Sequence, residues 1–407
     1  MIFGTIRIKK IQFIKIIPFI ILITFSTTFY IFMGNGALDY FQVFIMLISA
    51  FLYLRKFSIK RNETSLFLLI LCMFISIIYT KVIAITSLVY SIFFIFTFIE
   101  YKRCLEKQLI TLDSFKLFLK YIIYAYCIVI IIQQISKILG LPILNGLAFY
   151  TDEYRFNALS NEPSHTSRIL LICMVAYMYI KKISSDHKYT IIESLNSDKK
   201  LWIAYMYTLA TSGSATAFIS IPIAFLFFLN LKNFIIYGSI LFLAIIAAIN
   251  FIEIPFFIRI KELFAVILTF DTEIISYVEL SGAARVNQYI FYIQDFDILS
   301  LDTWLGKGNG YAGPMLLERV LGHESSMENA EAGGIFPVLF YDYGLLTGLA
   351  FIYALLKLCL HKKHLFFIFI WITIFSSTTF NSYIQWLFFC ISYTTIYLFK
   401  KKQLCIR

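Results

Sequence analysis

Charged side chains are scarce in this sequence: Asp, Glu, Lys and Arg make up 14% of its 407 residues, while 60% of the residues are hydrophobic. A soluble protein of this length needs far more polar surface, so the scarcity of charge excludes that class and indicates an integral membrane protein. The apolar segments recur from Ile11 to Phe399 without a soluble block between them. We therefore expect one polytopic membrane domain over residues 1–407.

Signals of several other classes are also missing. The seven cysteines are scattered, mostly inside apolar runs, and no pair has the spacing of a disulfide framework or a metal site. Residues 11–33 are too long for a signal peptide and contain no small-residue cleavage site, so we expect them to form the first span. The formal charge of +11 does not predict a nucleic-acid partner, because the Lys and Arg residues cluster beside predicted helix ends, where they meet anionic lipid headgroups.

The apolar segments predict an all-α integral membrane protein with about twelve transmembrane helices. Several segments are shorter than the roughly 20 residues that cross hydrocarbon at right angles, and the pair 201–211 and 214–230 could instead be one broken helix. The expected spans are 11–33, 37–54, 65–80, 82–99, 117–139, 166–180, 201–211, 214–230, 233–252, 331–356, 365–378 and 383–399.

The distribution of Lys and Arg gives the expected orientation. With both termini in the cytoplasm, every Lys-rich connection falls on the inner face, as the positive-inside rule requires. Joining 201–230 into one span would place the Lys-rich tail outside, which favours two spans. The inner connections and the tail carry Arg55, Lys56, Lys60, Arg61, Lys102, Arg103, Lys107, Lys181, Lys182, Lys199, Lys200, Lys232, Lys362, Lys363, Lys400, Lys401 and Lys402.

The same orientation puts two long polar loops, residues 140–165 and 253–330, on the outer face. Structureless loops of such length are uncommon in compact domains. Within the second loop, 258–270 and 284–295 have apolar residues at helical spacing, which predicts short amphipathic helices along the membrane surface. A protein that holds its Arg, His and Glu residues in outer loops is expected to act on something presented at that surface.

The first outer loop ends in a Glu-Pro-Ser step at residues 162–164, a typical helix start because proline suits the first helical turn. Together with Arg155, the exposed N–H groups of such a helix end form an anion site. Arg168 follows at the membrane edge, where a charge is costly unless it is paired or used. The alternative is structural: Glu162 pairs with Arg155 or Arg168 and only pins the loop.

The second outer loop carries Arg285, Lys307, His323 and a carboxylate cluster that ends at Glu331. His323 is the best general base in it, because imidazole titrates near neutrality; a plain surface histidine is the alternative. The glycine-rich turn 306–310 is only loosely similar to a phosphate loop, since it lacks the Gly-Lys-Ser/Thr ending.

Two further patterns favour a structural interpretation. Asp295-Phe296-Asp297 matches the Asp-x-Asp metal pattern of soluble sugar transferases, but nucleotide sugars are cytoplasmic and this loop is expected outside, so we predict a solvated acidic turn and no metal site. The small-residue break at residues 211–216 could line a polar cavity, although close helix packing is favoured.

Taken in order, these pieces resemble the O-antigen polymerase and O-antigen ligase superfamily of bacterial envelope glycosyltransferases. The resemblance covers roughly residues 150–355. Its parts are Arg155 with Asn161-Glu162-Pro163-Ser164 before a span, the break 211–216, Arg285 with the turn 306–310, and His323 followed by Asp342-Tyr343-Gly344 in the next span.

The resemblance implies a helical fold similar to the membrane glycosyltransferase C type, located as a multi-pass protein in the bacterial cytoplasmic membrane. The implied activity is polymerisation of oligosaccharide repeat units carried on undecaprenyl pyrophosphate, which yields O-antigen, capsule or exopolysaccharide. No cofactor is implied. The implied partners are the lipid-linked oligosaccharide, membrane lipids, a chain-length determinant protein and a flippase.

The resemblance also implies roles for single residues, because guanidinium groups bind phosphate oxygens through two parallel hydrogen bonds and a base must deprotonate the acceptor hydroxyl. The pyrophosphate-binding residues would be Arg155, Arg285, Arg168 and Lys307. The catalytic residues would be His323, Glu162 and Glu331. The alternatives are a ligase that transfers finished polymer to an acceptor and, in a different class, a flippase or transporter, which the lack of an internal repeat disfavours.

Overall fold

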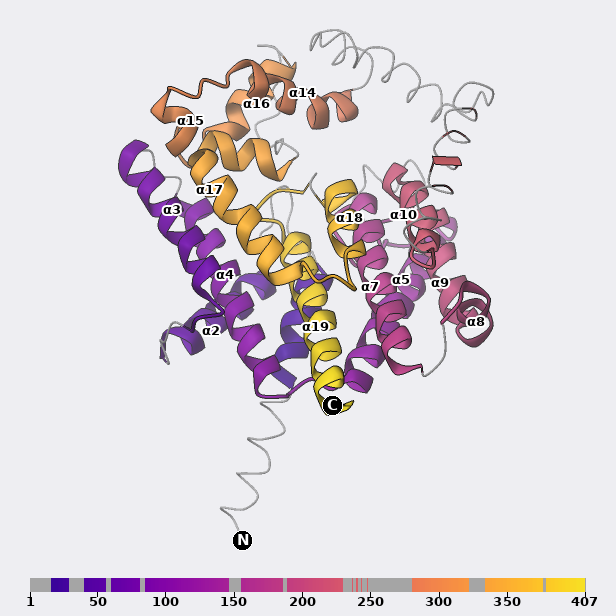
Figure 1. The fold of residues 1–407 in the computed structure, drawn as a ribbon. Coiled ribbons are helices and arrows are strands. Elements are labelled where there is room, and N and C mark those ends of the chain that lie inside the picture. Colours follow the sequence, from indigo (N-terminus) through magenta and orange to yellow (C-terminus); the bar gives the residue numbers. More distant parts are fainter. Residues whose placement is uncertain are drawn as a thin grey trace.

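The computed structural model describes residues 16–28, 40–55, 60–80, 85–145, 155–185, 189–229, 280–321, 334–375 and 378–406, together with a few single residues between 236 and 247. Within these ranges the regular secondary structure is entirely helical, which confirms the all-α prediction (Figure 1). The expected span 233–252 and the expected amphipathic helix 258–270 lie almost wholly or wholly outside the described residues.

The helices follow the predicted apolar segments closely, with ends displaced by a few residues. They are Ile16–Ser26, α2 (Tyr40–Arg55), α3 (Thr64–Thr80), α4 (Ile85–Glu106), α5 (Leu112–Ile138), α7 (Pro163–Ser184), α8 (Ile191–Ser197), α9 (Lys199–Thr211), α10 (Ala215–Leu226), α14 (Leu280–Gln294), α15 (Leu301–Leu305), α16 (Ala312–Leu321), α17 (Ile335–Cys359), α18 (Phe366–Thr373) and α19 (Tyr383–Ile406).

Two of the described helices, α5 and α17, are long and apolar enough to cross a membrane. The helices Ile16–Ser26, α2, α3 and α10 contain apolar stretches that are shorter than a perpendicular span requires.

α9 and α10 form an antiparallel hairpin. Tyr205 of α9 donates a hydrogen bond from its Oη to the carbonyl oxygen of Ser220 in α10 at 3.1 Å, and Trp202 stacks on Phe225 with ring centroids 5.1 Å apart. Both pairs are nearly symmetric about Gly213, which has a φ of +66°. The chain therefore reverses direction here, which agrees with two segments rather than one broken helix.

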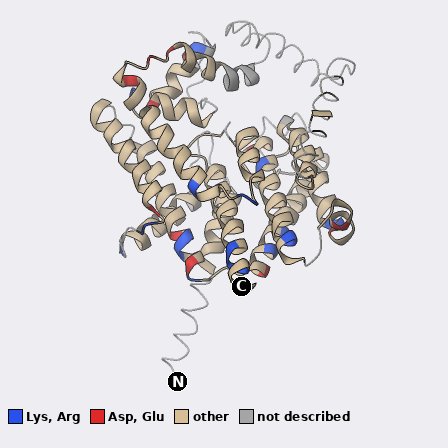
Figure 2. Ribbon diagram, viewed as in Figure 1, with Lys and Arg blue, Asp and Glu red and all other residues tan. Residues whose placement is uncertain are grey.

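The connections expected on the inner face meet at one end of the bundle. Lys402 of α19 donates to the carbonyl oxygen of Ile183 in α7 at 2.6 Å, and Lys363 lies 5.2 Å from the ring centroid of Phe399. Figure 2 shows Lys and Arg gathered toward the end that holds the C-terminus, whereas α14, α15 and α16 lie at the opposite end (Figure 1). Among the described residues, the connections expected on the inner face thus share one end of the bundle, and which side of a membrane this end faces stays a prediction.

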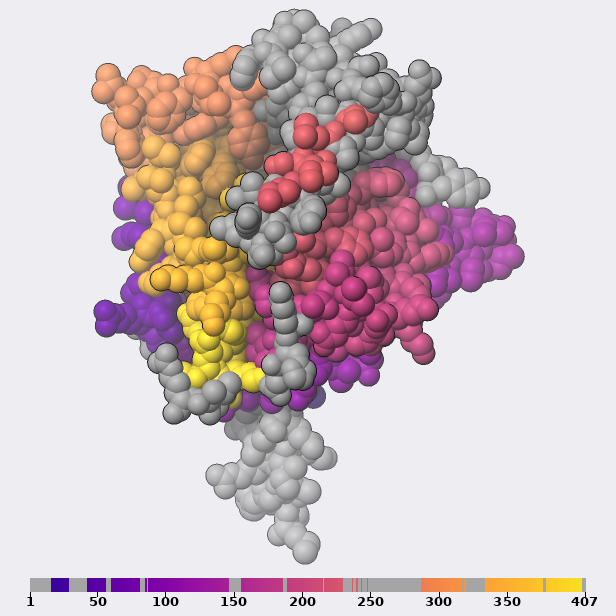
Figure 3. Space-filling model, turned by 45° about the vertical axis from the view of Figure 1, so that its right-hand side comes forward, coloured from indigo at the N-terminus to yellow at the C-terminus, as the bar shows by residue number. Residues whose placement is uncertain are grey.

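α7 is the most deeply buried of the described helices. Every residue from Pro163 to Ile180 is buried except His165, and the helix packs against α5, α10 and α19. In Figure 3 the magenta to rose atoms of the segment that holds α7 to α10 lie beside the orange to yellow atoms of the segment that holds α17 to α19. At 1.5 Å per residue its 22 residues extend about 33 Å, from Pro163 at one end of the bundle to Lys181 at the basic end.

Two glycines allow α15 and α17 to cross in backbone contact. Gly344 interrupts α17 with non-helical angles, φ +80° and ψ 170°, and Gly306 ends α15 with φ +83°. A Cβ atom on Gly306 would lie 2.4 Å from the carbonyl oxygen of Asp342, and one on Gly344 would lie 2.3 Å from that of Trp304. Both the positive φ and the close approach exclude any larger residue.

Gly306→Ala is therefore expected to destabilise the protein strongly, by about 2–4 kcal/mol, because the methyl group must push α15 away from α17 and the left-handed backbone disfavours a Cβ. Thermal unfolding of the purified protein in detergent measures the effect. Gly313→Ala in α16 is the matched control, since a Cβ there meets nothing within 4 Å. Equal melting temperatures for the two variants would contradict the backbone crossing.

Candidate functional site

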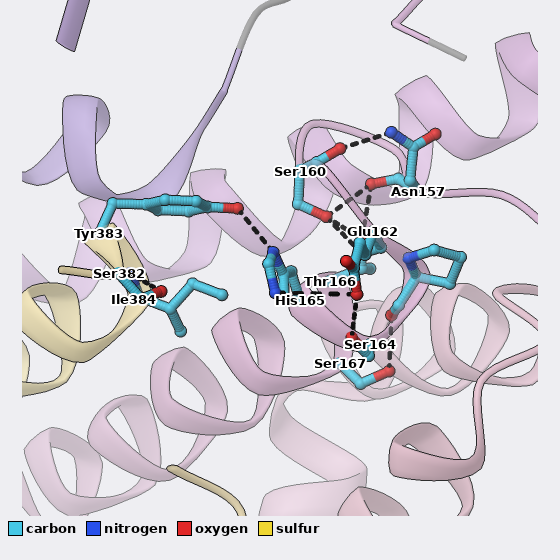
Figure 4. A network of polar contacts seen from close by, with 11 residues as sticks. Asn157, Ser160, Glu162, Ser164, His165, Thr166, Ser167, Ser382, Tyr383 and Ile384 are labelled. Atoms are coloured by element: carbon cyan, nitrogen blue, oxygen red, sulfur yellow. Dashed lines mark hydrogen bonds and ion pairs between the residues drawn. The ribbon is translucent and has the colours of Figure 1, made fainter. Parts of the chain in front are cut away.

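The segment that precedes α7 is held by a buried polar network centred on Asn157 (Figure 4). The carbonyl oxygen of Asn157 accepts hydrogen bonds from Ser160 Oγ at 2.9 Å and from Thr166 Oγ1 at 2.6 Å. Its side-chain Nδ2 donates to the carbonyl oxygen of Asn145 at 2.9 Å. Because Thr166 belongs to the first turns of α7, this network fixes the loop to the helix that it enters.

A second set of contacts ties the same segment to α5. Ala158 adopts a left-handed φ of +48°, and its N–H donates to Gln133 Oε1 at 3.0 Å. Asn145 Nδ2 donates to the carbonyl oxygen of Ala158, also at 3.0 Å. Gln133, Asn157, Ala158 and Ser160 are all almost completely buried. Since buried polar groups are costly when unpaired, these bonds hold the loop in one conformation.

Arg155 begins this segment and packs against the turn of the α9–α10 hairpin. A Cβ atom added to Gly213 would lie 2.9 Å from Arg155 Cγ and 3.5 Å from its Cβ. The loop arginine and the small-residue break are thus in direct contact, although they are 58 residues apart in sequence. The break packs closely as predicted, but against an arginine side chain as well as between helices.

The start of α7 brings together an acid, a hydroxyl and an imidazole. Glu162 is the N-cap residue, in an extended conformation, and Pro163 occupies the first helical position as the sequence predicts. Ser164 Oγ donates to Glu162 Oε2 at 3.0 Å, and His165 Nε2 lies 3.9 Å from the same oxygen. His165 Nδ1 lies 3.2 Å from Tyr383 Oη at the start of α19 (Figure 4).

Arg168 lies one turn further along α7, on the face that also carries Ser164 and His165. Its side chain is buried, with 4% of the residue exposed. A buried guanidinium is costly unless polar or charged groups surround it, and the start of α7 supplies such groups to Arg168.

The second of the two polar segments is anchored on α17 by its glycine turn, residues 306–310. The N–H of Lys307 donates to the carbonyl oxygen of Tyr341 at 2.7 Å, and the N–H of Gly308 donates to that of Asp342 at 3.2 Å. The carboxylate of Asp342 accepts from the N–H groups of Gly310, at 3.0 Å, and Ala312, at 2.7 Å. The N–H groups of Lys307, Gly308 and Gly310 in the glycine turn therefore donate to α17. They are not arranged to bind a phosphate group.

The remaining predicted site residues are placed only in part. Arg285 lies in the first half of α14, which confirms the helix expected at 284–295; its side chain is outside the described part of the structure. Lys307 is described, and its Nζ lies 5.4 Å from the Tyr311 ring centroid. His323 and Glu331 lie outside the described residues.

The Asp-x-Asp pattern serves a structural purpose. Asp295 accepts hydrogen bonds from Arg319 Nη1 at 2.5 Å and from Tyr341 Oη at 2.7 Å, and Asp297 accepts from the N–H of Leu299 at 2.9 Å. Burial raises the pKa of Asp295, but the hydrogen bonds and the charge of Arg319 outweigh it and hold that pKa below its usual value. In the described part of the chain, no group of three or more His, Cys, Asp and Glu residues could hold a metal ion.

Comparisons with protein-family models, with curated proteins and with solved structures find no match to this chain. The resemblance to the O-antigen polymerase and ligase superfamily accordingly rests on the residues named above and on how they are arranged.

Sequence reasoning gave no role to His165, Tyr383 or the carboxylate of Asp342. A polar residue at the start of an expected span was the available signal for His165. Tyr383 has no comparable signal, because it is one of 27 tyrosines and its contact with α7 bridges 218 residues of sequence. The Asp342 contact likewise depends on the kink at Gly344, which brings a loop onto a helix.

Asp342→Ala is expected to loosen α16 and the preceding turn, because the N–H groups of Gly310 and Ala312 lose their acceptor at a cost of about 2 kcal/mol or more. Hydrogen–deuterium exchange of peptides spanning residues 306–321 should accelerate, while exchange in α7 stays unchanged. Asp297→Ala is the control, since its carboxylate accepts from an exposed N–H in the same region. Unchanged exchange in Asp342→Ala would show that another group holds the turn.

Proposed function

We propose that this protein polymerises oligosaccharide repeat units carried on undecaprenyl pyrophosphate, at the outer face of a bacterial cytoplasmic membrane, as a glycosyltransferase C-like bundle of about twelve spans. One observation carries the proposal. Arg155 is seated on the Gly213 turn and is joined through a rigid, buried loop to the helix start that holds Glu162 and His165. A cation, a carboxylate and a base thus lie at the end of the bundle opposite the basic connections.

The chemistry requires little beyond positioning and charge neutralisation. The anomeric carbon of the donor chain is attached to pyrophosphate, which is already a good leaving group. Cations that bind the departing oxygens stabilise the charge that develops on them. Arg155 and Arg285 would bind the pyrophosphate, with Arg168 or Lys307 assisting.

The acceptor hydroxyl must lose a proton as it attacks the donor. His323 is the base that the sequence suggests, with Glu162 or Glu331 orienting or replacing it. The exposed apolar side chains on the outside of the bundle would contact the polyprenyl tails. A chain-length determinant protein and a flippase remain the partners that this function implies.

A ligase of the same superfamily would use the same donor chemistry and differs only in the acceptor. Deletion of the gene in its host distinguishes the two activities. Loss of polymerase leaves single repeat units on the acceptor, and we expect this result because repeat-unit transfer continues without chain growth. Loss of ligase would instead accumulate long lipid-linked chains, and an unchanged glycan profile would remove both activities. Mass spectrometry of lipid-linked and acceptor-linked glycans measures the outcome.

Arg155→Lys and Arg285→Lys are each expected to reduce polymer formation roughly 10- to 100-fold, because lysine keeps the charge but loses one of two parallel charge-assisted hydrogen bonds. Polymer is measured per amount of protein in the membrane. Arg319→Lys is the matched control at the same end of the bundle, since its guanidinium is already bound to Asp295. Full activity in both test variants at equal abundance would remove the pyrophosphate-binding role of these arginines.

A further inference from the structure

His165 is an exception within α7, the most buried helix in the described part of the chain. From Pro163 to Ile180 it is the residue of α7 that is not buried, and 19% of its side chain is exposed. Glu162 beside it is 43% exposed. The imidazole and the neighbouring carboxylate are thus both partly exposed at the start of a helix that is otherwise buried as far as Ile180. They lie at the end of the bundle opposite the Lys-rich connections. A histidine that only filled the core would be covered like its neighbours.

The two ring nitrogens of His165 have different surroundings. Nδ1 is within hydrogen-bond distance of Tyr383 Oη at 3.2 Å, and the two rings meet edge to face with an interplanar angle of 80°. Nε2 lies 3.9 Å from Glu162 Oε2, which is too long for a direct hydrogen bond. An oxygen atom placed about 2.8 Å from both Nε2 and Oε2 fits this spacing and would hydrogen-bond to both.

We propose that His165 is the catalytic base that deprotonates the acceptor sugar hydroxyl, with Glu162 as its partner and Tyr383 as a positioning residue. This inference rests on the proposed polymerase function and replaces His323 in that role. Tyr383 Oη accepts the proton of Nδ1, which leaves the lone pair on Nε2 directed toward the hydroxyl. The hydroxyl lies between Nε2 and the Glu162 carboxylate.

The acceptor oxygen forms a bond to the anomeric carbon of the donor chain while the bond from that carbon to the pyrophosphate oxygen breaks. The electron pair of the broken bond leaves with undecaprenyl pyrophosphate, whose charge the arginines neutralise. The hydroxyl proton passes to Nε2, and the imidazolium so formed is stabilised by the Glu162 carboxylate and then releases its proton to water.

None of the other described histidines lies near Arg155 or the start of α7, where the acceptor hydroxyl would have to be deprotonated. His361 and His364 lie between α17 and α18, within 3.2 Å of each other and beside Phe399 at the basic end of the bundle. Arg155, by contrast, lies in the segment fixed to the start of α7 by Asn157. The same rigid loop therefore sets the position of the cation and of the imidazole.

The test uses purified full-length protein in detergent or nanodiscs, with lipid-linked repeat units isolated from the deletion strain as substrate. His165→Asn places an amide nitrogen where Nδ1 was, so it retains the Tyr383 contact while it removes Nε2. We expect its turnover to fall about 100-fold or more, as for loss of a general base. Tyr383→Phe should lose about 5- to 10-fold, as for loss of one orienting hydrogen bond.

Imidazole rescue separates catalysis from structure. Added imidazole should restore part of the turnover of His165→Ala, whereas it should leave Arg155→Lys unchanged. If His165→Ala does not fold, the His165→Asn variant and the pH profile decide: wild-type kcat/KM should fall on acidification with the protonation of one group, and that limb should vanish in His165→Asn. His361→Ala, at the opposite end, should behave as wild type.

Wild-type turnover in His165→Asn would overturn the assignment while the polymerase function stands. Rescue of His323→Ala by imidazole in the same assay would then return the role of base to His323. A wild-type protein that polymerises no lipid-linked repeat units would instead defeat the proposed function itself. The two failures are therefore distinguishable in one set of assays.

Discussion

The buried polar network around Asn157 is the constraint on which the candidate site depends. It joins three parts of the chain: α5 through Gln133, the loop before α7 through Ala158 and Ser160, and α7 through Thr166. Loss of a partner would leave buried N–H and carbonyl groups unpaired, at about 1–3 kcal/mol each. The network holds Arg155 at its start and Glu162 at its end. The loop that carries Arg155 and Glu162 is thereby held by buried hydrogen bonds to the helices beside it.

Most of the fold was accessible from the sequence, because hydrophobic length and the placement of lysines report directly on helix positions. The start of α7 at Pro163 was predicted from the missing N–H of proline, and the α9–α10 reversal from the charge of the tail. The helix predicted at 284–295 is present as α14. These features depend on local chemistry, so a single sequence suffices to find them. The number of membrane crossings remains a prediction.

The arrangement of the site was less accessible, since it depends on contacts between distant segments. Nothing local indicates that Arg155 rests on Gly213, or that the turn after Gly306 is docked on Asp342. The structure nonetheless gives a physical reason for the patterns that carried the resemblance. Small residues at 211–216 make room for an arginine side chain, and the paired glycines 306 and 344 make room for each other's backbones. In both patterns, small residues allow a close approach between two segments of the chain. Small residues serve this purpose in many proteins, so each pattern alone is a weak signal of function.

Ion pairs join helices at both ends of the bundle, including Arg319 with Asp295 beside α14 and α16, whereas neutral groups hold the loop before α7. At the basic end, Arg103 and Glu63 form a buried ion pair at 3.1 Å, and Lys181 pairs with Asp198 at the same distance. These ion pairs join segments of the bundle to one another. At the other end, amides and hydroxyls hold the loop before α7. Buried neutral groups need no opposite charge beside them, provided that each is hydrogen-bonded. These bonds fix the backbone between Arg155 and Glu162, so the two charged residues at the ends of the loop are held at a set separation along the chain.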